Sequence, residues 1–247
     1  MTYRRYAVSG VLIQAIWLLG ACGDAPDNAA PAKNDAPVVQ SSPSPSATAV
    51  VSGPKRTVLA FGDSLYAGYG LGHGESLPDL LQQRLRARGI DGELINAGVS
   101  GDTTAGGRMR LAYTLDGLDR APDLVLLGLG GNDVLRQINP AETRANLEAM
   151  LDELERRGIP VILTGMLAPP NLGPDYAGQF NAIWPDLARK HDAALDPFIL
   201  QGVIGNRTLM LPDGVHPNAL GVAKIADRLA PLVESQLGKL PVDATSG

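Results

Sequence analysis

Ser64 is the serine whose position best suits a catalytic nucleophile, because it follows a short apolar run at a turn. A serine hydroxyl is a poor nucleophile at neutral pH, so it needs a base within hydrogen-bond reach. The chain has three histidines that could serve. His73 lies in a glycine-rich stretch without a carboxylate at an orienting spacing, and His191 lies in a charged stretch that predicts a solvated helix end.

His216 differs from the other two histidines because Asp213 precedes it by three residues, across a glycine. That spacing lets the carboxylate accept the Nδ1 proton and leaves Nε2 free to accept a proton from serine. We therefore predict Ser64 as the nucleophile, His216 as the general base and Asp213 as the residue that orients the base. The same spacing also occurs in loops with a purely structural role, and the spacing alone does not separate the two.

Acyl transfer also needs hydrogen-bond donors aimed at a developing oxyanion. The backbone N–H of Gly101 is unobstructed by a side chain, and the side-chain amide of Asn132 can donate a second bond. Each residue has a structural alternative. Gly101 could be a turn glycine that needs a positive φ, and Asn132 could be a helix cap or turn residue.

Short apolar runs alternate with amphipathic segments along residues 55–240, and they must position these side chains. The apolar runs predict buried strands at residues 57–61, 124–129 and 161–164, a further short strand at 93–96 and a weaker one at 194–196. Capping patterns predict helices that begin at Ser76 and at Asn139–Pro140, and a last helix spans 220–237. This alternation predicts a three-layer α/β/α domain with a central parallel sheet, in which the run 124–129 is central.

Ligands of open parallel sheets bind beyond the carboxyl ends of the strands. Four polar segments that contain glycine leave the predicted strands or precede the last helix at that edge: residues 62–65, 98–102, 130–133 and 213–217. We therefore expect the four segments to converge on one site.

Composition excludes several other functions. A net charge of −5 offers no basic surplus for nucleic acid. A single cysteine and three histidines show no zinc-binding spacing, and neither a phosphate-binding GxxxxGK[ST] loop nor a strand-linked GxGxxG is present. We therefore expect no nucleic-acid partner, no cofactor and no metal.

The N-terminal residues predict export rather than a folded domain. Residues 1–22 combine a basic start, a short apolar run and small residues before Cys22, as in a bacterial lipoprotein signal peptide. Cys22 is then the lipidated residue; the alternative is an ordinary cleaved signal with an incidental cysteine. Residues 23–54 are rich in Ala, Pro and Ser and predict a disordered linker, and residues 241–247 predict a disordered tail.

The four polar segments together resemble the sequence blocks of the SGNH hydrolases, also called GDSL esterases and lipases. The blocks read GDSLYAGYG (62–70), NAGVSGDTT (96–104), LGGNDVLR (129–136) and DGVHPNALG (213–221). The wording is most similar to the branch that contains the periplasmic thioesterase I/lysophospholipase L1 and bacterial arylesterases. The resemblance implies a flavodoxin-like sheet, a triad of Ser64, His216 and Asp213, and an oxyanion hole formed by the N–H groups of Ser64 and Gly101 with the Asn132 side chain.

The expected function is hydrolysis of carboxylic aryl or acyl esters, or of thioesters, through an acyl-enzyme. An O-acetylesterase or acyltransferase acting on cell-envelope glycans is the alternative, and an inactive lipid-anchored binding protein is a third. The loop 166–176 is either the wall of an acyl or aryl pocket or a rigid connection. We expect a monomer that acts on a small-molecule or lipid ester. It would face the periplasm from a membrane anchor, or be soluble there if Cys22 is not lipidated.

Overall fold

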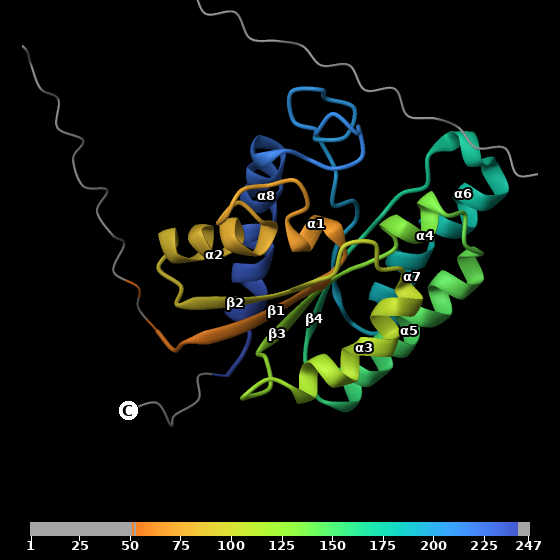
Figure 1. The fold of residues 1–247 in the computed structure, drawn as a ribbon. Helices are drawn as coiled ribbons and strands as arrows, with labels where there is room; N and C mark the ends of the chain where they lie inside the picture. Colours follow the sequence, from red (N-terminus) through yellow and green to blue (C-terminus); the bar gives the residue numbers. More distant parts are fainter. Residues whose placement is uncertain (1–50, 52, 242–247) are drawn as a thin grey trace, which may run out of the picture. The chain divides into compact units, whose positions relative to one another are not determined.

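The computed structural model describes residue 51 and residues 53–241. Its centre is a parallel five-stranded sheet with the strand order β2-β1-β3-β4-β5 (Figure 1). The strands are β1 (Arg56–Gly62), β2 (Gly92–Gly98), β3 (Leu124–Gly128), β4 (Val161–Thr164) and β5 (Ala194–Asp196). Every residue of β3 is buried, and β3 lies in the middle of the sheet, as its uninterrupted apolar sequence predicts.

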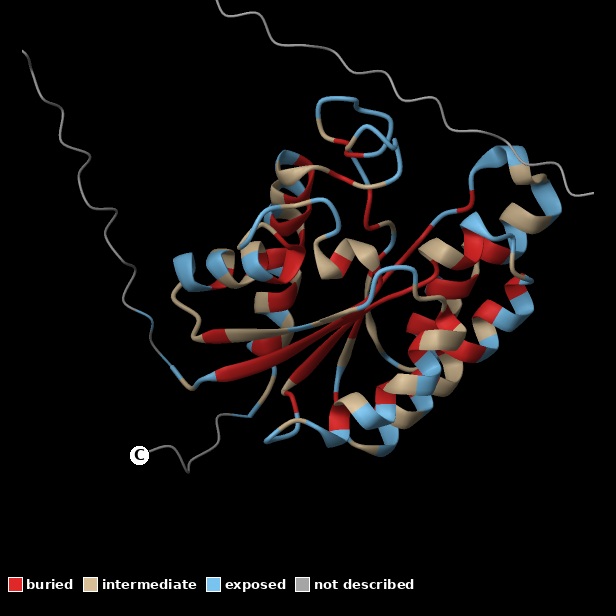
Figure 2. Ribbon diagram, in the orientation of Figure 1, coloured by how far each residue is buried: buried red, intermediate tan, exposed pale blue. Residues whose placement is uncertain are grey.

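Helices cover both faces of this sheet, which confirms the predicted three-layer fold. On one face lie α1 (Ser64–Ala67), α2 (Leu77–Ala87) and α8 (Ala219–Leu237), and on the other lie α3 (Thr104–Asp116), α5 (Pro140–Arg156) and α7 (Ile183–Lys190) (Figure 1). The remaining elements are α4 (Gly131–Leu135), the 3-10 turn η1 (Pro170–Leu172) and α6 (Pro174–Asn181). Figure 2 shows that burial concentrates in β1, β3 and β4 and in the helix faces that pack against the sheet.

Two helices begin where their capping residues predict. The Ser76 hydroxyl accepts a hydrogen bond from the Asp79 N–H while the Asp79 carboxylate accepts one from the Ser76 N–H, so α2 starts with a capping box. The Asn139 side chain accepts from the Ala141 N–H at the start of α5, with Pro140 in the first turn. These short-range bonds form within one turn and do not depend on the rest of the fold.

Helix α3 is the main element that the sequence patterns did not predict. Its sequence includes Gly106 and Gly107 and has a weak apolar stripe. A Cβ atom at Gly107 would lie 2.2 Å from Leu129 Cδ1, so a larger residue at this position would have to displace the Leu129 side chain next to β3. Tertiary packing therefore outweighs the low helix propensity of this segment.

The predicted signal peptide (1–22) with Cys22, nearly all of the predicted linker (23–54) and residues 242–247 of the predicted tail lie outside the described residues. Within the described part of the chain, no helix is both long and apolar enough to cross a membrane.

Candidate active site

Ser64, His216 and Asp213 form one continuous chain of hydrogen bonds beyond the carboxyl ends of the strands. Ser64 is the first residue of α1, two residues after the end of β1, and its Oγ lies 2.9 Å from His216 Nε2. His216 Nδ1 lies 2.7 Å from Asp213 Oδ2. When Nδ1–H donates to the carboxylate, Nε2 carries the free lone pair and can accept the serine proton. The geometry thus matches a serine nucleophile with an oriented base.

The Asp213 side chain also holds the loop that carries His216. Its Oδ1 accepts from the backbone N–H groups of Val215, at 2.9 Å, and of His216, at 3.0 Å. The His216 N–H bond, with the imidazole bond and the Val215 N–H bond, lowers the pKa of Asp213 to about 2. The Leu211 N–H closes the loop by donating to the His216 carbonyl at 2.7 Å. The carboxylate is therefore charged at neutral pH and fixed toward the imidazole.

Tyr69 lies against the imidazole and was not singled out by the sequence patterns. The centroid of its ring is 4.5 Å from that of His216, with 37° between the two planes. Its backbone N–H donates to the Ser64 carbonyl at 3.1 Å, so it belongs to the same turn as the serine. The π face of Tyr69 can stabilise an imidazolium that forms at His216.

Asn132 and Gly101 lie in two turns that meet beside this triad. The Asn132 side chain, in the first turn of α4, donates from Nδ2 to the Asp102 carbonyl at 2.8 Å. An amide has a second N–H, which leaves one donor for a ligand. The φ of Gly101 is +85°, in the left-handed region that favours glycine. Gly101 therefore also fits its structural alternative, a turn glycine that needs a positive φ. Asn132 lines the cavity described below, whereas Gly101 is outside the set of lining residues.

Asp133 fixes the start of α4 and is a further residue that the sequence patterns missed. It is buried, with 1% of its surface exposed, and it accepts from the Thr104 N–H at 2.8 Å and from the Thr104 hydroxyl. The Thr143 hydroxyl donates to it at 3.1 Å from α5. These bonds join three helices directly behind Asn132. No local spacing signals this role, because the donors come from positions far apart in the chain.

Asp63 is a buried carboxylate next to the serine. Its Oδ1 caps α1 by accepting from the Leu65 N–H at 3.1 Å, and only 3% of its surface is exposed. Burial raises the pKa of Asp63 to about 6, against the opposing effects of the Leu65 N–H and of His216. The negative charges of Asp133 and Asp102 add to the increase.

A cavity of about 620 Å³ opens beside Ser64, Asn132 and His216. Most of its other lining side chains are apolar: Leu65, Val134, Leu135, Met166, Leu167, Ala168, Pro169, Pro170, Phe198, Leu200, Ile204 and Val215. The first half of the loop 166–176, residues 166–170, lines this cavity. Farther along, in the first turn of α6, the Tyr176 hydroxyl donates to the Ile138 carbonyl at 2.9 Å.

Neither of the other two histidines is hydrogen-bonded to Ser64, whose imidazole partner is His216. His73 is exposed. The prediction that His191 is solvated is wrong: 5% of its side chain is exposed, because the end of α7 packs it against α5. Its Nδ1 lies 3.1 Å from Glu155 Oε2, and its Nε2 lies 3.9 Å from Asp152 Oδ1.

These three side chains are also the one group among the described residues whose spacing could hold a metal ion, with ligand atoms within 4.8 Å of one another. The adjacent ion pairs Arg144–Asp186 and Glu148–Lys190 join the same two helices. The group therefore continues a row of α5–α7 ion pairs, which accounts for its composition without a metal.

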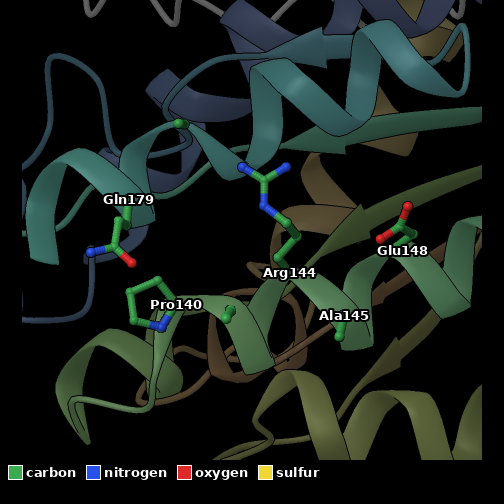
Figure 3. Close-up of a pocket in the computed structure, with 7 residues that line it drawn as sticks. Pro140, Arg144, Ala145, Glu148 and Gln179 are labelled. Carbon is green, nitrogen blue, oxygen red and sulfur yellow. The ribbon is translucent and has the colours of Figure 1, made fainter.

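A second cavity, of about 490 Å³, lies between α5 and α6 (Figure 3). Its lining residues are Pro140, Ala141, Arg144, Ala145, Glu148, Gln179 and Ala182. None of these is a hydroxyl, thiol or imidazole side chain, so this cavity has no nucleophile–base pair among the residues that line it. Among the described residues, the hydrogen-bonded serine–histidine pair lies at the first cavity.

Comparison with known proteins agrees with this geometry. Residues 60–224 match the GDSL-like Lipase/Acylhydrolase family. The chain is similar to the Esterase TesA of Pseudomonas aeruginosa, at 38% identity over 74% of this chain and 90% of the relative. It is also similar to the Thioesterase 1/protease 1/lysophospholipase L1 of Escherichia coli K12, at 36% identity over 70% of this chain and 81% of the relative.

A solved structure supports the same assignment. AlinE4, described as an SGNH-hydrolase family esterase, superposes with a TM-score of 0.64 at 50% identity over 74% of this chain and 97% of that chain. The five-stranded sheet, the serine–histidine–aspartate geometry and these relatives agree with one another. The chain therefore belongs to the GDSL-like lipase/acylhydrolase family, and it is an esterase.

Proposed function

We propose that this esterase acts through an acyl-enzyme on Ser64, with His216 as general base and Asp213 as the residue that orients His216. The hydrogen-bonded chain Ser64–His216–Asp213, which opens onto an apolar cavity, is the observation that carries this proposal. Ser64 Oγ attacks the ester carbonyl carbon while its proton passes to His216 Nε2. His216 then protonates the leaving alkoxide, phenoxide or thiolate, and a water molecule repeats the sequence to release the acid and free Ser64.

The oxyanion of the tetrahedral intermediate is held, in this proposal, by the N–H groups of Ser64 and Gly101 and by the Asn132 amide. Asn132 supports this role because its Nδ2 is already oriented by the Asp102 carbonyl and its side chain faces the cavity. A preoriented donor costs no reorganisation when the charge develops, which is why such donors lower the barrier.

The proposed substrates carry an apolar acyl or aryl group longer than acetyl. Four large apolar side chains at the cavity are themselves substantially exposed: Leu135, Leu167, Ile204 and Val215. An apolar group of the substrate would cover these side chains, and burial of apolar surface contributes roughly 25 cal/mol per Å². An acetyl group would leave most of the cavity in water. This favours aryl esters, acyl thioesters or lysophospholipids over the O-acetylated glycans of the alternative.

The test is hydrolysis of a p-nitrophenyl ester series from acetate upward by the purified chain, with Ser64→Ala as the matched inactive variant. We expect kcat/KM to rise with chain length, and we expect Ser64→Ala to lose both turnover and covalent labelling by a fluorophosphonate. Full activity of Ser64→Ala would reject the mechanism. A clear maximum at acetate would reject the long-acyl proposal and support the O-acetylesterase alternative.

We further propose that the chain is an exported lipoprotein anchored to a membrane through Cys22 and facing the periplasm. The support is the sequence alone: a signal-peptide pattern ending at Cys22, followed by the linker composition of residues 23–54. Attached acyl chains would hold the protein on the membrane without a spanning helix. In this arrangement residues 55–240 act as a monomeric esterase domain at the end of the linker.

The localisation is tested by expression in a Gram-negative host, followed by incorporation of labelled palmitate and detergent phase partition. We expect the wild type to carry the label and to enter the detergent phase, and Cys22→Ser to do neither while it retains esterase activity. An unlabelled, water-soluble wild type would support the ordinary signal peptide instead. Light scattering of the Cys22→Ser protein measures the expected monomer.

A further inference from the structure

The Arg110 guanidinium joins three segments at the carboxyl edge of the sheet. From α3 its Nε donates to Asp102 Oδ2 at 2.6 Å, its Nη1 donates to the Ala97 carbonyl at 2.9 Å, and its Nη2 donates to the Gly62 carbonyl at 2.9 Å. Its Cζ lies 3.8 Å from the centroid of the Phe61 ring. The charge is mostly buried, with 21% of the side chain exposed. The guanidinium is therefore held in place by one carboxylate, two backbone carbonyls and one aromatic ring.

Two of these three bonds, those to Gly62 and Asp102, lead to parts of the proposed oxyanion site. Gly62 is two residues before Ser64, at the end of β1. Asp102 directly follows Gly101 in the chain, and its own carbonyl accepts the hydrogen bond from the Asn132 side chain at 2.8 Å. The Ser64 N–H is two residues from the Gly62 carbonyl that Arg110 binds. The Gly101 N–H is one residue from Asp102, whose side chain Arg110 also binds, and the Asn132 amide donates to the Asp102 carbonyl.

We propose that Arg110 is a positioning residue of this esterase that sets the spacing between the oxyanion donors. The inference rests on the proposed function, since it assigns Arg110 a role only through those donors. Arginine suits this role because its planar fork presents several donors in a fixed geometry, which the single ammonium of lysine cannot reproduce. The Arg110 charge is balanced by Asp102, so Arg110 acts on the oxyanion through geometry and not through its own charge.

Gly106 offers a second way to disturb the same contact. A Cβ atom at this position would lie 2.6 Å from Asp102 Oδ1, so an alanine must displace the Asp102 carboxylate from its place beside Arg110. The backbone of α3 at Gly106 has an ordinary helical conformation, and alanine has a higher helix propensity than glycine. Gly106→Ala should therefore disturb the loop that carries Gly101 and Asp102 while the helix itself is retained.

Arg56 provides a matched control at the opposite, amino end of β1. It is also a buried arginine with one carboxylate partner and two backbone carbonyl partners: Asp123, Leu240 and Pro241. Loss of Arg56 should lower the stability of the fold without changing the distances among the oxyanion donors. The pair Arg110 and Arg56 therefore separates a positioning role from a purely structural one.

The experiment compares Arg110→Gln, Arg110→Lys, Gly106→Ala and Arg56→Gln for kcat and KM, at a temperature where urea unfolding shows all of them folded. A trifluoromethyl ketone, which forms a tetrahedral oxyanion with serine, is titrated alongside. We expect the Arg110 variants and Gly106→Ala to lose roughly tenfold to a hundredfold in kcat, since a misplacement of about 1 Å costs on that order. KM should change little, and affinity for the ketone should fall in parallel with kcat.

Arg56→Gln should instead keep the wild-type kcat and ketone affinity despite lower stability. The proposal is overturned if Arg110→Gln retains kcat and ketone affinity like Arg56→Gln, or if its only defect is a higher KM. If the Arg110 variants do not fold, Gly106→Ala decides by the same criteria. Loss of the proposed function would look different, because Ser64→Ala would then retain activity.

Discussion

Replacement of Asp63 by asparagine is expected to stabilise the protein by an amount that depends on pH. The Asp63 carboxylate is buried next to Ser64, and its Oδ1 accepts from the Leu65 N–H. Asparagine keeps that acceptor and the shape of the side chain but cannot ionise. The variant therefore removes the cost of a buried charge while it leaves the cap of α1 in place.

The sign and the size follow from the pKa of Asp63, which burial raises from 3.8 to about 6. Between these two values the folded protein keeps the proton, whereas the unfolded chain has lost it. Stability that depends on Asp63 therefore falls as the pH rises through this window, and the loss is complete above about pH 6. A change of one in pKa corresponds to about 1.4 kcal/mol, so the total is about 3 kcal/mol.

Urea unfolding of the wild type and of Asp63→Asn at several pH values from 4 to 8 measures this difference. The free energy of unfolding of the variant, relative to the wild type, should increase by about 2 kcal/mol from pH 4 to pH 7, or roughly 4–8 °C in Tm. The exposed carboxylate of Asp119 supplies the control, since Asp119→Asn should show a nearly flat difference. A difference for Asp63→Asn that is equally flat, or that decreases with pH, would refute the reasoning.

Three further predictions concern the candidate active site and the contact between β2 and α1. Asn132→Ala should lower kcat by roughly 10²–10³ with little change in stability, as measured by steady-state kinetics; unchanged kcat would remove Asn132 from the oxyanion site. Asp213→Asn should lower kcat by about 10⁴, because the imidazole loses the partner that fixes its tautomer, and retained activity would contradict the triad. Gly98→Ala should destabilise the fold by about 1–3 kcal/mol, because its Cβ would lie 2.2 Å from the Ala67 backbone nitrogen. Urea unfolding measures this loss, and wild-type stability would show that β2 and α1 can separate at no cost.

Local patterns were sufficient wherever the determining contacts lie within one turn or one strand. The cap at Ser76 involves Asp79, three residues on, and the bond between Asp213 and His216 has the same separation. Apolar runs such as 124–128 predict buried strands because a strand covered on both faces needs apolar residues at every position. The sequence by itself therefore determined the order of the five strands and of α2, α5 and α8, the parallel sheet and the residues of the candidate triad.

The tertiary structure decided the parts of the site whose contacts span long stretches of the chain. Ser64 and His216 are 152 residues apart, and only the sheet brings them within hydrogen-bond distance. The position of Asn132 depends on the buried Asp133. The loop that carries Gly101 and Asp102 is held by Arg110, whose partners lie on three segments. Such contacts leave no periodicity or spacing in the sequence, because their geometry arises only when the layers pack.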